Sequence, residues 1–146
     1  MYKKILLAVD QSDHSKKAVN HTKDLAEKLG ADVVIFHSYE LPSALTDYAI
    51  MYHIPEDKQK QMQENLNNKH SKFLQSIKDE FNELEVNAST MYKNERPGPA
   101  IVETAKNLQC DLIVMGSRGL SGVQSMFVGS VSNYVLHNAE IPLLIV

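Results

Sequence analysis

Glycines near the C-terminus form a pattern that is typical of phosphate binding. The chain reads Gly116-Ser-Arg-Gly119, then nine residues, then Gly129-Ser130. Because glycine has no Cβ, a ligand can approach the backbone closely, and φ can become positive. A helix that begins near Ser130 would direct free N–H groups and the positive end of its dipole toward an anion. If both loops face one ligand, the pattern predicts a nucleotide.

Further groups that could contact phosphate lie in the loop after Gly116. Arg118 offers a cation, and Gly122 follows Gly119 at the same spacing. A lone Gly-x-x-Gly is also typical of a flexible surface turn, and the added Gly129-Ser130 favours phosphate binding. The loop lacks the Gly-Lys-Ser/Thr of a Walker motif, and a dinucleotide fingerprint would follow the first strand. Arg118 and a bound Mg²⁺ are the evident substitutes for the missing lysine. The loop hydroxyls belong to Ser117, Ser121, Ser125 and Ser130.

Two other predicted strand ends carry polar groups. In a doubly wound sheet, ligands bind outside the carboxyl ends of the strands, where strand order reverses. Asp10 follows the run Ile5–Val9. Its carboxylate could hold ribose hydroxyls or a metal, or it could cap the next helix. Ser38 follows the run Val33–Phe36, in His37-Ser38-Tyr39, where backbone groups could contact an adenine edge.

The elements that would position these residues alternate between strand and helix. Ile5–Val9 and Val33–Phe36 are short, unbroken apolar runs, which are typical of buried parallel strands. The alternation predicts a single layered α/β domain over residues 1–146 with a parallel sheet. The other predicted strands are Val86–Tyr92, Leu112–Met115 and Ile141–Val146. Four helices are predicted. The first begins at Ser12 or Asp13 and stops at Gly30, and the second runs from Glu56 to about Phe81. The third begins at Pro99, and the fourth runs from Ser130 to Asn138.

The long helix from Glu56 carries one apolar stripe, which predicts a face that packs in the core. Its members are Met62, Leu66, Phe73, Leu74, Ile77 and Phe81.

The segment Glu40–Pro55 has no clean period. It contains Pro42 and Pro55. Loops of this length are usually functional or disordered, so the segment is either a lid or contact surface, or a loop packed over the sheet edge. Its large side chains are Leu45, Tyr48, Ile50, Met51 and Tyr52.

Composition excludes several classes of protein. With 43% hydrophobic and 23% charged residues, neither disorder nor a membrane protein is indicated. The formal charge of -3 argues against a broad electrostatic contact with nucleic acid or anionic lipid. The only cysteine, Cys110, is predicted to be a packed thiol. The six histidines show no metal-ligand spacing, and no signal peptide is recognised, so we expect a cytoplasmic protein.

The last predicted strand is wholly apolar from Leu143 to Val146. Pro142 suits the first residue of a strand or a sheet edge. Because bare edges invite pairing, we expect a homodimer formed through Ile141–Val146.

Three parts of the sequence together resemble the universal stress protein family, in its nucleotide-binding branch. They are Ile5-Leu-Leu-Ala-Val-Asp10, the glycine string from Gly116 to Ser130, and Ile141-Pro-Leu-Leu-Ile-Val146. The resemblance spans the whole chain. It implies a three-layer, doubly wound fold with a five-stranded parallel sheet, Rossmann-like and similar to adenine nucleotide alpha hydrolases. It also implies ATP at the strand ends, and dimers through the last strand. We expect Mg²⁺ to accompany the ATP.

The resemblance also implies roles for individual residues. Asp10 would contact ribose, and Ser38 would lie at the adenine. Family members often have His-Val at His37-Ser38, a change of little consequence if the contact is made by the backbone. Met115 and Gly116 would lie behind the nucleotide. The phosphates would be surrounded by Arg118, Gly119, Gly129, Ser130 and Val131.

Three functions remain open at this point. The first is an ATP-binding regulator of the stress response that acts as a dimer on a signalling partner the sequence does not name. The second is a slow ATPase or nucleotide transferase that uses Asp10 with Mg²⁺, and Arg118, although no positioned base or Walker lysine is visible. The third is a structural dimer that binds AMP, a flavin nucleotide or no nucleotide.

Overall fold

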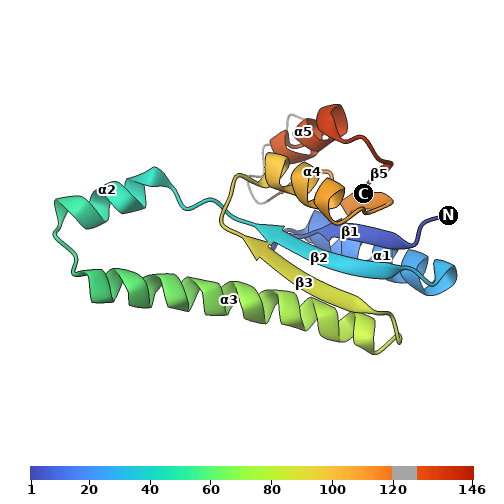
Figure 1. The fold of residues 1–146 in the computed structure, drawn as a ribbon, viewed down its shortest axis with the longest axis horizontal. Helices are drawn as coiled ribbons and strands as arrows, with labels where there is room; N and C mark the ends of the chain where they lie inside the picture. The colour runs from blue at the N-terminus through green and yellow to red at the C-terminus, as the bar shows by residue number, and fades with distance from the viewer. Residues whose placement is uncertain (120–127) are drawn as a thin grey trace.

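The computed structural model describes residues 1–119 and 128–146, and a five-stranded parallel sheet forms its centre (Figure 1). The strand order is β3-β2-β1-β4-β5, and every neighbouring pair is parallel. Strand order reverses between β1 and β4, as in a doubly wound fold. This confirms the α/β architecture expected from the sequence. The strands are β1 (Lys4–Ala8), β2 (Asp32–Ser38), β3 (Ala88–Lys93), β4 (Leu112–Met115) and β5 (Leu143–Ile145).

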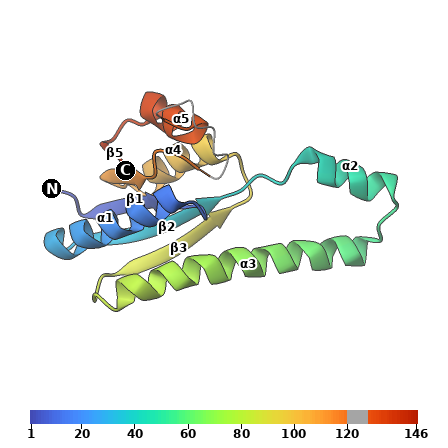
Figure 2. The same cartoon turned by 180° about the vertical axis from the view of Figure 1, so that it is seen from behind.

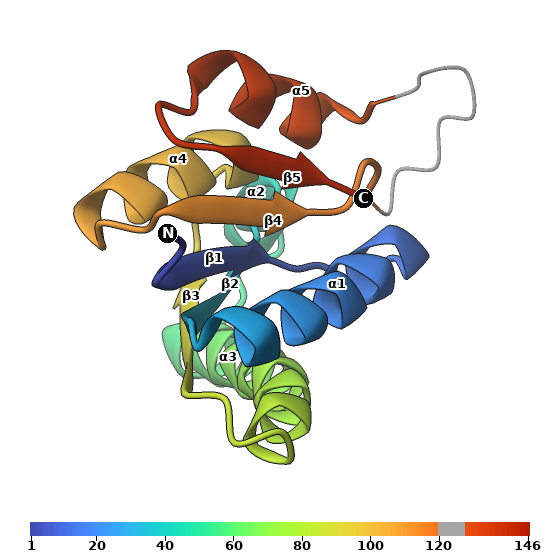
Figure 3. The ribbon, with the colours of Figure 1, turned by 90° about the vertical axis from the view of Figure 1, so that its right-hand side faces the viewer.

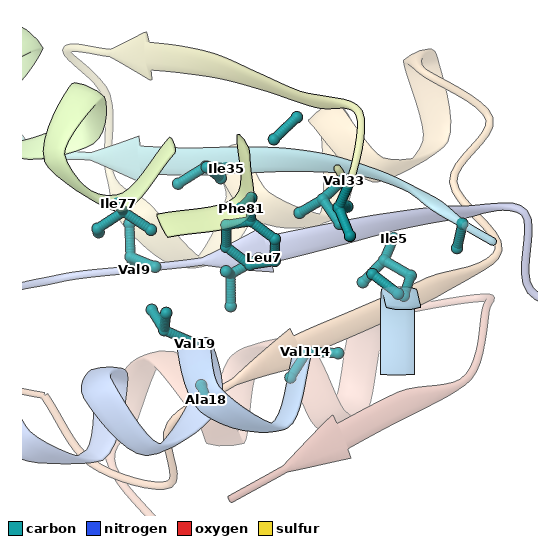
Figure 4. Packing of buried hydrophobic residues seen from close by; sticks show 14 of the residues in the cluster. Ile5, Leu7, Val9, Ala18, Val19, Val33, Ile35, Ile77, Phe81 and Val114 are labelled. Carbon is teal, nitrogen blue, oxygen red and sulfur yellow. The ribbon is translucent and has the colours of Figure 1, made fainter. Parts of the chain in front are cut away.

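Helices cover both faces of this sheet (Figures 2 and 3). Ile5 and Leu7 of β1 pack in a cluster with residues of α1 and α3, part of which Figure 4 shows. Leu6 and Ala8 pack in a second cluster with residues of α4 and α5. Because both faces are buried, the central strands are unbroken apolar runs. The helices are α1 (Asp13–Leu29), α2 (Ser43–Met51), α3 (Glu56–Asn82), α4 (Pro97–Asn107) and α5 (Ser130–Asn138).

Capping residues set both ends of α1. The Ser12 Oγ accepts a hydrogen bond from the backbone N–H of Ser15 at 3.1 Å, so Ser12, rather than Asp13, is the N-cap. Gly30 ends the helix with a φ of 64°, a conformation that glycine adopts without steric cost. The alternative that Asp10 caps this helix is therefore wrong.

Helix α4 begins two residues earlier than the sequence predicts. Arg96 is its N-cap, and Pro97 rather than Pro99 occupies the first helical position. Both prolines are tolerated because the N–H groups of a first helical turn have no intrahelical acceptor.

The segment Glu40–Pro55 contains α2, which the sequence did not predict. No residue of α2 is buried, and Tyr48 and Met51 are 53% and 71% exposed. Figures 1 and 2 show α2 and the first half of α3 extending away from the sheet, beyond the ends of β2 and β3. The segment is therefore not packed over the sheet edge. We call residues 43–66 the arm.

Helix α3 belongs to the core only in its second half. Leu74, Ile77 and Phe81 are buried, whereas Met62 is 56% exposed. The prediction that the whole apolar stripe packs in the core is wrong for the part that lies in the arm. Among the described residues, no helix combines the length and the apolar character needed to cross a membrane.

Candidate nucleotide-binding site

A cavity of about 200 Å³ lies at the carboxyl ends of β1, β2 and β4, next to the point where strand order reverses. Apolar side chains form much of its lining, among them Phe36, Ile101 and Met115. Ligands bind at this place in doubly wound sheets, and an apolar lining suits an aromatic base.

Seven of the nine predicted site residues line this one cavity. Gly129 and Ser130 lie beside it. The Gly129 N–H donates to the Ser117 carbonyl oxygen at 2.7 Å, and Ser130 begins α5. The structure thus brings together residues that are up to 121 positions apart between Asp10 and Val131. The seven lining residues are Asp10, Ser38, Met115, Gly116, Arg118, Gly119 and Val131.

Asp10 joins the first strand end to the glycine loop. Its Oδ1 accepts the backbone N–H of Ser12 at 2.9 Å, and its own N–H donates to the Ser15 Oγ at 3.0 Å. Its Oδ2 lies 2.9 Å from the position that a Cβ would take at Gly119. The carboxylate is therefore held by the N-cap residue of α1, and it faces the loop after β4.

The hydroxyl of Ser38 is already engaged in the protein. Its Oγ donates to the Glu95 carbonyl oxygen at 2.6 Å and the residue is buried. A ligand at this strand end would therefore meet the Ser38 backbone rather than its side chain.

Three other residues hold the loop after β4 in place. The Ser117 N–H donates to the carbonyl oxygen of Val146 at 2.8 Å. The Ser132 Oγ donates to the Gly116 carbonyl oxygen at 2.9 Å, and the Ser117 Oγ is 3.1 Å from the His14 Nδ1. Neither His14 nor Ser132 was predicted to belong to the site, because the sequence around a polar residue inside a helix does not indicate its distant partner.

Gly116 and Gly119 are needed for close packing, not for a positive φ. A Cβ at Gly116 would lie 2.8 Å from the backbone carbon of His14. Neither Gly116 nor Gly119 has a positive φ, and Gly129 has a φ of -69°. The glycines thus let α1 and Asp10 approach the loop. Gly122, Ser121 and Ser125 lie outside the described residues.

The start of α5 can bind an anion. Gly129 is the N-cap and offers no side-chain hydrogen bond, so the N–H groups of Ser130, Val131 and Ser132 have no acceptor within the helix. Arg118 lines the cavity, and no carboxylate among the described residues forms an ion pair with it. Backbone donors, a helix dipole and a cation therefore meet at one end of the cavity.

Several lining residues were missed as ligand contacts. Val9 and Phe36 lie at the ends of β1 and β2, and the strand-end rule could have identified them. Ile101 could be predicted to be buried, but only the placement of α4 shows that it reaches the cavity. Within residues 1–119 and 128–146, no group of three or more His, Cys, Asp or Glu side chains is arranged to hold a metal ion.

Comparison with known proteins identifies the family. Residues 1–146 match the model of the universal stress protein family. The chain is 36% identical over its whole length to the universal stress protein YxiE of Bacillus subtilis, of which it covers 99%. The hypothetical protein MJ0577 has a similar structure, with a TM-score of 0.85 at 24% identity over 100% of this chain and 96% of the other. A universal stress protein solved in complex with cAMP has a TM-score of 0.67 at 25% identity, covering 99% and 96%. The chain belongs to the universal stress protein family.

Proposed function

We propose that this chain is a stress-response regulator that binds ATP in the cavity between the ends of β1, β2 and β4. The observation that carries this proposal is the junction of an apolar cavity with the open N-terminus of α5 and with Arg118. One end suits a base and the other suits phosphates. The family member solved with cAMP supports an adenine nucleotide as the ligand.

In this proposal each part of the nucleotide meets a different element. The adenine lies between apolar side chains beside the Ser38 backbone, and the ribose hydroxyls donate to the Asp10 carboxylate. The phosphates accept hydrogen bonds from the first turn of α5 and from Arg118. Mg²⁺ bound with ATP would neutralise part of the phosphate charge.

Titration calorimetry with ATP, AMP and adenosine tests this arrangement. We expect ATP to bind most tightly, and Arg118→Ala to weaken ATP more than adenosine, because Arg118 would contact only the phosphates. An equal loss of affinity for ATP and for adenosine in Arg118→Ala would contradict the placement of the phosphates beside Arg118. Lack of ATP binding to the unaltered protein would refute the proposed function.

Hydrolysis is measured in the same samples. A regulator needs affinity rather than turnover, so we expect ATP to be recovered intact by chromatography. Phosphate release that is lost in Asp10→Asn and Arg118→Ala while ATP still binds would favour the slow ATPase.

We further propose that two copies join along β5, the strand at one edge of the sheet (Figure 3). The Ile113 N–H donates to the Pro142 carbonyl oxygen, and the Val146 N–H donates to that of Met115. Pro142 and Val146 therefore face β4, and by the alternation of a strand the backbone groups of Leu143 and Ile145 point to the open edge. These groups could pair with the same strand of a second copy.

A further inference from the structure

Two histidine rings beside the candidate site are joined by a hydrogen bond. His37 lies in β2 and lines the cavity, and His70 lies in α3. The His37 Nδ1 is 2.8 Å from the Val9 carbonyl oxygen, and its Nε2 is 3.1 Å from the His70 Nδ1. The pair therefore links the end of β1, the end of β2 and the helix that continues into the arm.

The partners determine which ring nitrogens carry hydrogen. Because the Val9 carbonyl can only accept, the His37 Nδ1 must donate. In the neutral ring the His37 Nε2 is then an acceptor, so the His70 Nδ1 donates to it. The His70 Nε2 keeps a lone pair, and it is buried with no hydrogen-bond partner in the described part of the chain. The observed contacts thus fit two neutral rings, both protonated at Nδ1.

Aromatic rings enclose the pair. The His70 ring stacks on Tyr92 with a centroid distance of 4.6 Å and an interplanar angle of 15°. Phe73 lies edge-on to His37 at 5.5 Å, and Tyr39 lies 5.6 Å from His70. Three elements, β2, β3 and α3, therefore contribute rings to one cluster.

Within residues 1–119 and 128–146, few charged groups face the two rings. Asp10, from the loop after β1, favours a proton on His37, as does the Val9 carbonyl. Lys69, on α3, disfavours one on His70, as does His37. The phenols of Tyr39 and Tyr92 also lie beside His70. Burial is the largest effect and lowers the pKa of both His37 and His70, so the pair is neutral at neutral pH.

A proton added to this pair has no good position. The first would enter at the His70 Nε2, which has no acceptor. A second would enter at the His37 Nε2 and would face the His70 Nδ1–H. Either proton would therefore place an N–H group where it has no acceptor, which disfavours the contact between the end of β2 and α3.

We propose that His37 and His70 are positioning residues, which hold the ends of β1 and β2 in the arrangement that accepts the adenosine part of the nucleotide only while both rings are neutral. This role rests on the proposed function. Because binding then favours the neutral pair, ATP affinity falls as the pH falls through the pKa values of the two rings in the free protein. Burial lowers both pKa values, so the loss begins below about 6.5, the ordinary value for histidine.

Calorimetry with ATP at about pH 8 and about pH 5.5 tests the role, using the unaltered protein and His70→Asn. Asn keeps an N–H donor toward the His37 Nε2 but cannot titrate. Protonation of ATP itself affects both proteins equally, so the difference between their pH profiles reports the pair. We expect the unaltered protein to lose more ATP affinity than His70→Asn over this range. Equal profiles would overturn the role of the pair.

Nitrogen NMR of the histidine rings gives a readout that needs no ligand. At about pH 8, both His37 and His70 should be in the Nδ1–H tautomer, and in His70→Phe only His37 should remain so. Nε2–H signals for either ring in the unaltered protein would overturn the pair. Expected tautomers without ATP binding at about pH 8 would instead refute the proposed function, and with it the role assigned to the pair.

Discussion

At the scale of single residues, Gly119 is informative because its missing Cβ leaves room for Asp10. A Cβ there would lie 2.9 Å from the Asp10 Oδ2, which is too close for a carboxylate already held by Ser12. We expect Gly119→Ala to displace the carboxylate and weaken ATP binding by about tenfold, or ~1.4 kcal/mol, with little change in folding stability. Calorimetry measures the first effect and urea unfolding the second.

A double-mutant cycle supplies the control for this prediction. In an Asp10→Ala background the clash is absent, so Gly119→Ala should have no further effect on ATP affinity. An equal loss in both backgrounds would show that the new methyl group obstructs the ligand directly.

Gly116 differs from Gly119 because its neighbour is backbone. A Cβ would lie 2.8 Å from the backbone carbon and from the Cβ of His14, so α1 itself would have to move. We expect Gly116→Ala to destabilise the fold by about 1–3 kcal/mol in urea unfolding. An unchanged midpoint of urea unfolding would mean that the loop after β4 moves to accommodate the new methyl group and that α1 stays in place.

At the scale of elements, α3 divides into a packed half and a free half. We expect Leu74→Ala to lower the free energy of unfolding by about 2–5 kcal/mol because Leu74 is buried. Met51→Ala, in the arm, should change it by less than about 0.5 kcal/mol. Urea unfolding compares the two, and a large loss for Met51→Ala would show that the arm packs against something in solution.

The same division explains which elements could be predicted from the sequence. The spacing of apolar residues along the chain reflects which face of an element is buried. The buried elements β1, β2 and β4 and the buried part of α3 could therefore be predicted, with small errors at their ends. Helix α2 has no buried residue, so no period marks it. Met62 continues the stripe of α3, but the 27 residues of the helix span about 40 Å, whereas the six residues of β3 span about 20 Å. The apolar stripe predicts which face of α3 turns toward the sheet. The length of the sheet determines how much of that face is buried.

For the site, the strand-end rule and the family resemblance together located seven lining residues in advance. Neither the rule nor the resemblance could predict side-chain contacts between distant parts of the chain. The pairing of His37 with His70, and of Ser132 with the Gly116 carbonyl, depends on how α3 and α5 are placed against the sheet. No local spacing records that placement.

At the scale of the whole molecule, the open edge of β5 leads to a prediction about assembly. Ile145→Pro removes an N–H that points away from β4, and it leaves the hydrogen bonds of Pro142 and Val146 with β4 in place. We expect the unaltered protein to sediment as a dimer at micromolar concentration and Ile145→Pro to sediment as a folded monomer.

Leu144→Pro is the matched control. Because Leu144 faces β4, its replacement should weaken the fold itself, seen as a lower melting temperature. A dimer that survives Ile145→Pro would place the interface elsewhere, and the exposed apolar side chains of the arm would then be the next surface to alter.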